Sequence, residues 1–199
     1  QPSMTNVTLA NNVHEAIGVT TGSYDGDIGL NVVGLPYWVE GDLQLSSGYT
    51  HTFVIQPGVV VKMAGTGTDI QIPNNKLVAN GTVSSPIVFT SAYDDSRLGD
   101  SNEDGSATTP AKGDWGGINF GGSASSSSSL SYVVINYAGN ASSSGAGFPI
   151  RVDPRTQPSM TNVTLANNVH EAIAVNTGLY DGDIGLNVVG LPYWVAADL

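Results

Sequence analysis

The chain contains no cysteine, so disulfide bonds and thiolate metal sites are excluded. Basic residues are scarce: six Lys and Arg stand against 17 Asp and Glu, giving a formal net charge of −11. Because binding to a nucleic-acid backbone needs clustered Lys and Arg, nucleic acid is not an expected partner. No apolar run approaches the roughly 20 residues of a membrane-spanning helix, so this segment is not expected to contact a membrane.

Strong helix formers are also few, since charged residues make up only 12% of the chain while 25 residues are Gly. The remainder is rich in Ser, Thr and Asn, which argues against a helical protein. This composition is typical of secreted or surface-displayed prokaryotic β-proteins. We therefore expect an extracellular or cell-surface location.

What the chain does contain is a long internal repeat. Residues 1–43 and 157–199 align at an offset of 156 and differ at only five positions. The differing pairs are Gly18/Ala174, Thr20/Asn176, Ser23/Leu179, Glu40/Ala196 and Gly41/Ala197. We interpret residues 1–156 as one repeat unit and residues 157–199 as the start of the next. Such a chain is expected to be a window of a longer tandem array, which favours a fibre or stalk over a self-contained enzyme.

Short runs of alternating apolar and polar residues, separated by Gly, Asn and Pro turns, predict an all-β protein. The predicted strands are Asn6–Leu9, Ala16–Val19, Tyr37–Val39, Leu43–Leu45, His51–Ile55, Val59–Met63, Asp69–Ile72, Lys76–Ala79, Ile87–Thr90, Gly117–Phe120, Tyr132–Asn136, Pro149–Val152, Asn162–Leu165 and Ala172–Val175. Two segments interrupt this rhythm: an acidic insertion at 94–115 and a Ser-rich loop at 121–129.

The repeat selects among the all-β architectures. A sandwich or barrel closes on itself, so tandem copies would need linkers, and none separates Val152 from the second copy. A parallel β-helix has open ends, so the next copy can continue the coil. We therefore predict a β-helix (β-solenoid) that is continuous across tandem 156-residue repeats, with tandem β-sandwich units as the alternative. Coils of roughly 20–25 residues would give about seven coils per unit, with a rise on the order of 30–35 Å.

Residues 55–120 carry a further pattern. It includes Pro57-Gly58-Val59, then Pro86-Ile87 with Phe89-Thr90-Ser91, then Gly113-Asp114-Trp115, and Tyr137-Ala138-Gly139 follows it. This stretch resembles the right-handed parallel β-helix repeat segments of large bacterial and archaeal surface proteins with a D-x-N-x-D-G calcium-type loop. The resemblance implies a right-handed parallel β-helix. It implies less about function, because such segments occur in adhesins, stalks and enzyme-associated modules.

The acidic insertion contains a candidate metal site. Asp100, Asn102 and Asp104 alternate oxygen ligands ahead of Gly105, as in the first half of an EF-hand-like calcium loop. The Glu that completes such a loop is missing, because Ala111 occupies its position. The flanking acids that could complete the site are Asp94, Asp95 and Asp114. Oxygen ligands favour calcium, which we expect in a structural role; the alternative is a solvated acidic loop.

Other candidates are weaker. Asp25 and Asp27 recur in the second copy and predict either a second ion site or a tight turn. Tyr37-Trp38 and its copy Tyr193-Trp194 predict either a packed corner or a sugar-stacking platform. N-x-[ST] sequons occur at Asn6, Asn80, Asn140 and Asn162. No recognised catalytic motif is present, so no catalytic residue and no enzyme activity are predicted.

The expected function is therefore mechanical: a segment of a giant repetitive filament, stalk or adhesin shaft on a prokaryotic cell surface, stiffened by calcium. Expected partners are further copies of the repeat, lateral neighbours in a fibre, and surface glycans. The alternative is a carbohydrate-binding or carbohydrate-cleaving β-helix that resembles a polysaccharide lyase.

Overall fold

The structure is a computed structural model that describes residues 4–46, 48, 50–122, 127–142, 147–156, 158–176, 186–187 and 189–195. All strand pairs in this part of the chain are parallel. The strands are β1 (Ile17–Val19), β2 (Gly22–Tyr24), β3 (Ile28–Leu30), β4 (Tyr37–Val39), β5 (Leu43–Leu45), β6 (Thr52–Ile55), β7 (Val60–Met63), β8 (Asp69–Pro73), β9 (Lys76–Asn80), β10 (Ile87–Ser91), β11 (Gly117–Gly121), β12 (Ser129–Asn136), β13 (Ile150–Val152), β14 (Ser159–Ala166), β15 (Ile173–Val175) and β16 (Tyr193–Val195).

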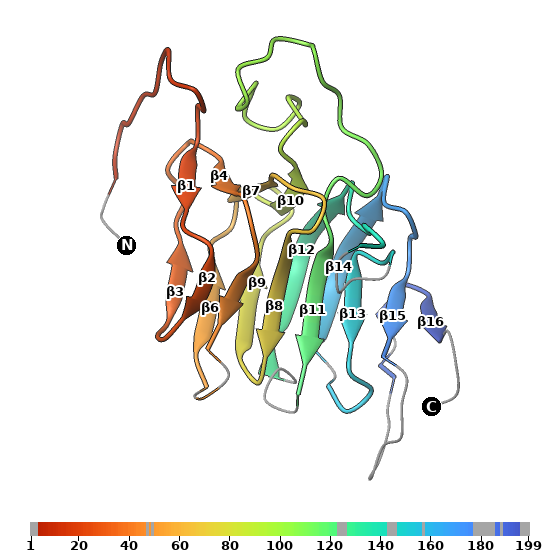
Figure 1. Cartoon of the computed structure of the whole chain (residues 1–199). Coiled ribbons are helices and arrows are strands. Elements are labelled where there is room, and N and C mark those ends of the chain that lie inside the picture. The colour runs from red at the N-terminus through yellow and green to blue at the C-terminus, as the bar shows by residue number, and fades with distance from the viewer. Residues whose placement is uncertain are drawn as a thin grey trace.

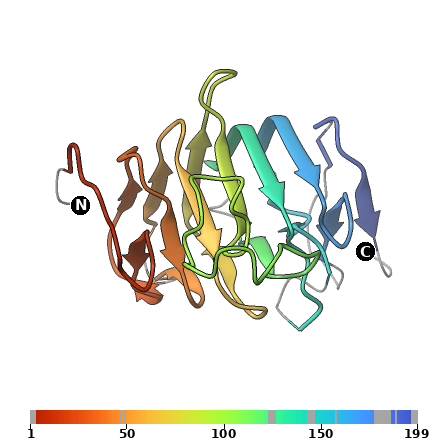
Figure 2. The same ribbon diagram turned by 90° about the horizontal axis from the view of Figure 1, so that it is seen from above.

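The strands form two sheets that make three faces of one coil. The nine-stranded sheet runs β1-β4-β7-β10-β12-β9-β6-β3, with β14 also paired to β12. The C-terminal part of β12 pairs with β10 and belongs to the first face, whereas its N-terminal part pairs with β9 and belongs to the third face. The second face is the seven-stranded sheet β16-β15-β13-β11-β8-β5-β2. This is a right-handed parallel β-helix, as predicted, with the N- and C-terminal coils at opposite ends of the stack (Figures 1 and 2).

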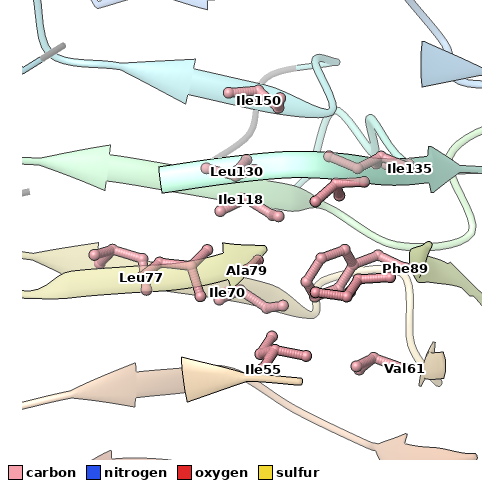
Figure 3. Close-up of a cluster of buried hydrophobic side chains, with 14 of the residues drawn as sticks. Ile55, Val61, Ile70, Leu77, Ala79, Phe89, Ile118, Leu130, Ile135 and Ile150 are labelled. Atoms are coloured by element: carbon pink, nitrogen blue, oxygen red, sulfur yellow. The ribbon is translucent and has the colours of Figure 1, made fainter. Parts of the chain in front are cut away.

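Alternate residues of the three faces fill the interior. Figure 3 shows Val61 and Phe89 of the first face directed toward the same core as Ile70 of the second and Leu77 of the third. All four side chains are fully buried. Each such side chain contributes about 1.5–3 kcal/mol relative to an exposed one, so the stacked core is the main source of stability.

Left-handed residues turn the corner between the third and first faces. Tyr132 divides β12 with a φ of 48°, and Asn162 occupies the same position in β14 with a φ of 53°. Asn adopts this conformation more readily than most residues, because its short amide can bond to the local backbone. The corner lets one strand serve two faces without breaking its pairing to the next coil.

The acidic insertion between β10 and β11 lies over the outside of the coil (Figure 1). Outward positions of β7 and β10 would otherwise meet solvent, yet Lys62, Val88 and Thr90 are all buried. The insertion also bonds to the start of the chain, where the Glu15 N–H donates to the Ser101 carbonyl at 3.2 Å. It is therefore a strap packed on the first face.

The second copy adds to both sheets. β14 pairs with β12, and β15 pairs with β13. The copies do not lie on the same face, however: β1 belongs to the first face, whereas the equivalent strand β15 belongs to the second. One unit therefore makes about five and one-third coils. The estimate of seven was wrong, because the insertion uses residues without adding a coil.

Most predicted strands are present, and Tyr37–Val39 and Leu43–Leu45 have the predicted bounds. The strand predicted at Asn6–Leu9 is wrong, because these residues form no strand pairing in the described structure. β2 and β3 were not predicted; each has three residues with one Gly, too short for the alternation to be recognised. The Ser-rich loop lies partly outside the described residues, at 123–126.

Candidate metal centre

The insertion begins with a tight turn that is organised by Asp94. This carboxylate is 3% exposed and accepts hydrogen bonds from Thr90 Oγ1 and Ser96 Oγ, both at 2.5 Å. It also accepts from the Ser96 N–H at 3.2 Å. The side chain of Asp94 thus fixes the turn that leads out of β10 and directs the next residue, Asp95, toward the following loop.

The D-x-N-x-D-G segment forms a compact loop. Asp100 accepts hydrogen bonds from the Asp104 N–H at 3.3 Å and the Gly105 N–H at 2.7 Å. Gly105 has a φ of 73°, the left-handed conformation that the tight turn requires and that Gly adopts without strain. Asn102 Nδ2 donates to Asp104 Oδ2 at 2.6 Å. These contacts gather the alternating oxygen groups on one side of the loop.

Three carboxylates converge there. Asp95, Asp100 and Asp104 each offer an oxygen within 4.8 Å of the others, and all three are half-buried. Asp95 Oδ1 and Asn102 Oδ1 are buried and accept no hydrogen bond. Buried acceptors without partners are costly, and clustered oxygen acceptors are the ligands that Ca²⁺ takes. Asp95, Asp100, Asn102 and Asp104 could therefore hold a calcium ion.

A buried ammonium group lies beside the cluster. Lys62 is fully buried beneath the insertion, and its Nζ donates to the Gly99 carbonyl at 2.6 Å. Burial lowers the pKa of Lys62, and the negative charges of Asp95, Asp94 and Asp100 oppose that shift. Lys62 could not be recognised as part of the site from the sequence, because its burial depends on where the insertion packs.

The pKa values of the carboxylates reflect their crowding. Burial, and next the charge of Asp100, raises the pKa of Asp95, against a smaller opposing effect of Lys62. The hydrogen bond from Thr108 instead lowers the pKa of Asp104. One ammonium faces three carboxylates, so the cluster retains negative charge that a divalent cation could neutralise.

Two of the predicted ligands do not join the cluster. Asp94 uses its oxygens in the turn described above. Asp114 accepts hydrogen bonds from Ser91 Oγ at 2.6 Å and from the Ala111 N–H at 2.9 Å, and so fastens the other end of the insertion to β10. Asp95 is thus the flanking acid that the fold brings to the loop.

Asp25 and Asp27 do not converge on a common point. Asp25 Oδ1 lies 3.0 Å from His51 Nε2, and Asp27 Oδ1 accepts from the Thr52 N–H at 2.7 Å. These contacts connect the turn after β2 to the next coil, which favours the turn interpretation. The copies of these residues, at 181 and 183, lie outside the described residues.

The aromatic pair in the first copy belongs to a packed corner. Tyr37 is 1% exposed, and its hydroxyl donates to the Asn31 carbonyl at 2.9 Å. Trp38 is nearly buried and stacks on His14 with ring centroids 4.2 Å apart. In the second copy Trp194 stacks on His170 with ring centroids 5.5 Å apart and is half exposed, which makes it the most exposed tryptophan among the described residues.

The four sequons differ in their surroundings. Asn6, Asn80 and Asn162 are exposed, whereas Asn140 is half-buried and its Nδ2 donates to the Gly113 carbonyl at 2.7 Å. An amide that is already engaged is a poorer acceptor for a glycan.

In the described part of the chain, no helix is long and apolar enough to cross a membrane.

Comparison with known proteins agrees with the geometry. Residues 22–150, more than half of the chain, match the family described as pectate-lyase-like beta helix domain. The chain belongs to this family. No curated protein and no solved structure gives a significant match. Membership fits a polysaccharide-related or a structural β-helix; the family includes enzymes, and its domains are typically extracellular or secreted.

Proposed function

We propose that this chain is a structural segment of a repetitive extracellular filament, stalk or adhesin shaft on a prokaryotic cell surface. One observation carries the proposal: β14 and β15 of the second copy add to the edges of β12 and β13 of the first. A coil that its own repeat extends is suited to building length. Further units would also cover the open strand edges that otherwise promote aggregation.

Calcium is the proposed stiffening element. The insertion runs over the outside of several coils, and its fixed ends are the turns of Asp94 and Asp114. Between those ends, Asp95, Asp100 and Asp104 repel one another unless a cation is bound. An ion there would hold the middle of the insertion against β7, where Lys62 is buried.

The test is thermal unfolding in calcium and in chelator. Wild-type protein should gain several degrees in Tm on adding calcium, because an ion that binds only the folded state stabilises it. The double substitution Asp100→Asn and Asp104→Asn should abolish this gain. The matched control is Asp25→Asn with Asp27→Asn, which removes the same charge elsewhere and should leave the calcium response intact. A response lost in both variants, or absent from wild type, would contradict the calcium site.

A carbohydrate-binding function is the second candidate. Family membership and the half-exposed ring of Trp194 favour it. Cleavage has less support, because Lys62, the base beside the acidic cluster, is fully buried and bonded to Gly99, where a polymer does not reach it. Binding of neutral polysaccharides, compared between wild type and Trp194→Ala, tests this candidate; retained binding in that variant would exclude the proposed stacking.

A further inference from the structure

The same sequence occurs in this structure in a docked and an undocked form. Residues 1–17 and 157–173 are identical. In the second copy they form β14 and the start of β15, which pair with β12 and β13. In the first copy, residues 4–16 take part in no strand pairing among the described residues. The first copy therefore carries a segment whose docked conformation is known from the same molecule.

The undocked segment already has the backbone of the docked one at its corners. Asn6 has a φ of 54°, against 53° for Asn162. Asn11 has a φ of 58°, against 59° for Asn167. Little reordering at these corners would be needed for docking, which keeps the entropic cost of association low.

The contacts made on docking are missing from the first copy. Val163 is 9% exposed, whereas the equivalent Val7 is 37% exposed. Asn168 is fully buried, donates to the Ile135 carbonyl at 2.9 Å and accepts from the Ala138 N–H at 2.8 Å. Its equivalent Asn12 is exposed and bonds only to nearby Glu15 among the described contacts.

A hollow in the first copy corresponds to a filled site in the second. It encloses about 290 Å³. Its lining consists of His14, Ala16, Gly18, Val19, Thr20, Trp38 and Glu40.

In the second copy, Phe148 from the preceding coil occupies the corresponding place. Phe148 packs on Ala172 and Ala174, the equivalents of Ala16 and Gly18. Its ring centroid lies 4.6 Å from that of His170, the equivalent of His14. The hollow thus has the neighbours that a phenylalanine in this position contacts.

We propose that residues 4–19 form a docking surface for a second copy of this chain. The occupant is the β12–β13 edge of that copy, whose Phe148 enters the hollow beside His14. This inference rests on the proposed structural function and specifies the joint between units. The joint is the contact between the β12–β13 edge of one molecule and residues 4–19 of the next. Within a single molecule, the second copy (β14 and β15) already covers the β12–β13 edge. Two molecules therefore associate when the first copy of one replaces the second copy on the β12–β13 edge of the other.

Because the two copies are identical over this segment, they provide matched variants. Val163→Asp with Leu165→Asp weakens the chain's own β14 and frees the β12–β13 edge for another molecule. We expect this variant to form head-to-tail dimers and longer chains with rising concentration, as measured by sedimentation velocity. The same change in the first copy, Val7→Asp with Leu9→Asp, should remain monomeric.

Combining the four substitutions should abolish association. Association that persists in the combined variant, or a well-folded second-copy variant that remains monomeric, would overturn the proposal. Far-ultraviolet circular dichroism establishes folding.

A thiol cross-link tests the register even if the second-copy variant is only partly folded. Arg151 pairs with Ala174, so in the proposed joint Arg151 of one molecule lies opposite Gly18 of the other. The chain has no cysteine of its own, so introduced thiols are unique. Arg151→Cys is placed in the Val163→Asp, Leu165→Asp chain, and Gly18→Cys in an otherwise unchanged chain.

Strand neighbours about 4.8 Å apart lie within disulfide range, so the mixture should cross-link rapidly. Ser84→Cys, at an exposed position outside the joint, is the control for Gly18→Cys. Cross-linking no faster than this control would refute the joint. Neither experiment depends on calcium, so a failure of the calcium site remains distinguishable from a failure of the joint.

Discussion

At the residue scale, Asp94 and Asp95 show how adjacent carboxylates acquire different roles. Asp94 is saturated by hydrogen bonds from Thr90 and Ser96 and holds a turn. Asp95 reaches the loop and retains an oxygen without a hydrogen-bond partner. The sequence identifies both as candidate ligands but cannot separate them, because the difference depends on the direction in which the chain leaves β10.

The raised pKa of Asp95 predicts a specific pH dependence. For an acid whose pKa is higher in the folded state, the extra stability exists at low pH and is lost as the pH rises through that pKa. In chelator, Asp95→Asn should therefore match wild type at low pH and become more stable than wild type toward neutrality. In calcium the order should reverse, because the variant lacks a ligand.

Measuring the Tm of wild type and of Asp95→Asn against pH, in chelator and in calcium, tests both predictions. A variant less stable than wild type at neutral pH in chelator would contradict the raised pKa of Asp95.

Lys62 provides a second prediction at this scale. Lys62→Met keeps the apolar stem but removes the charge that partly balances Asp95 and Asp100. Lys62→Met also removes the buried charged donor of the hydrogen bond to the Gly99 carbonyl, and such hydrogen bonds are worth about 1.5–3 kcal/mol, so we expect a loss of about 2 kcal/mol in chelator. Calcium should recover much of this loss, so the calcium-induced rise in Tm should exceed that of wild type. Urea unfolding in both conditions measures it; an unchanged stability in chelator would show that Lys62 does not balance the cluster.

At the element scale, one sequence adopts two states according to its neighbours. Residues 159–166 form β14 because the edge of β12 supplies hydrogen bonds and a core surface. In the first copy, residues 4–10 have the same alternation and form no strand. Strand formation here is decided by an adjacent strand edge, which no local pattern contains.

Asn168 and Asn12 allow a matched test of that dependence. Asn168→Ala leaves the Ile135 carbonyl and the Ala138 N–H without their side-chain partner between coils, which should cost about 1–3 kcal/mol of unfolding free energy. Asn12→Ala changes an exposed side chain and should cost less than about 0.5 kcal/mol. Urea unfolding of both variants gives the comparison. Equal effects would mean that Asn168 does not connect the coils.

The same reasoning explains how far the sequence could predict this fold. Strands such as Leu43–Leu45 were predicted because their alternation of apolar and polar residues reflects burial on one side. β2 and β3 were missed, because three residues with a Gly become a strand only by pairing with β5 and β6. The loop Asp100–Gly105 was predictable from spacing alone. Lys62 was not, since its burial results from the packing of a distant insertion.

At the scale of the whole molecule, the change of face between copies has a consequence for an array. If each unit advances by five coils and one face, successive units are rotated by about one-third of a turn. Every acidic insertion would then point in a new direction, and the pattern would return after three units. The rise per unit would be about 25 Å, less than seven coils would give.

The rotation predicts how insertions are displayed. In a polypeptide of six linked units, image averaging by electron microscopy should find insertions on three sides of the rod, with a pattern repeating about every 75 Å. Insertions aligned along one side would contradict the shift of β15 to the second face. A control without the insertion, in which a short turn replaces residues 94–114, should have the same rise and a smooth surface.

The most direct test of the central claim is the length of rods made of two, four and six linked units. Small-angle X-ray scattering in calcium should give a maximum dimension that grows by about 25 Å per unit, with the profile of a stiff rod. That result would establish one continuous coil built for length. Independent globules on flexible connections, with a dimension that grows less than linearly, would contradict the account.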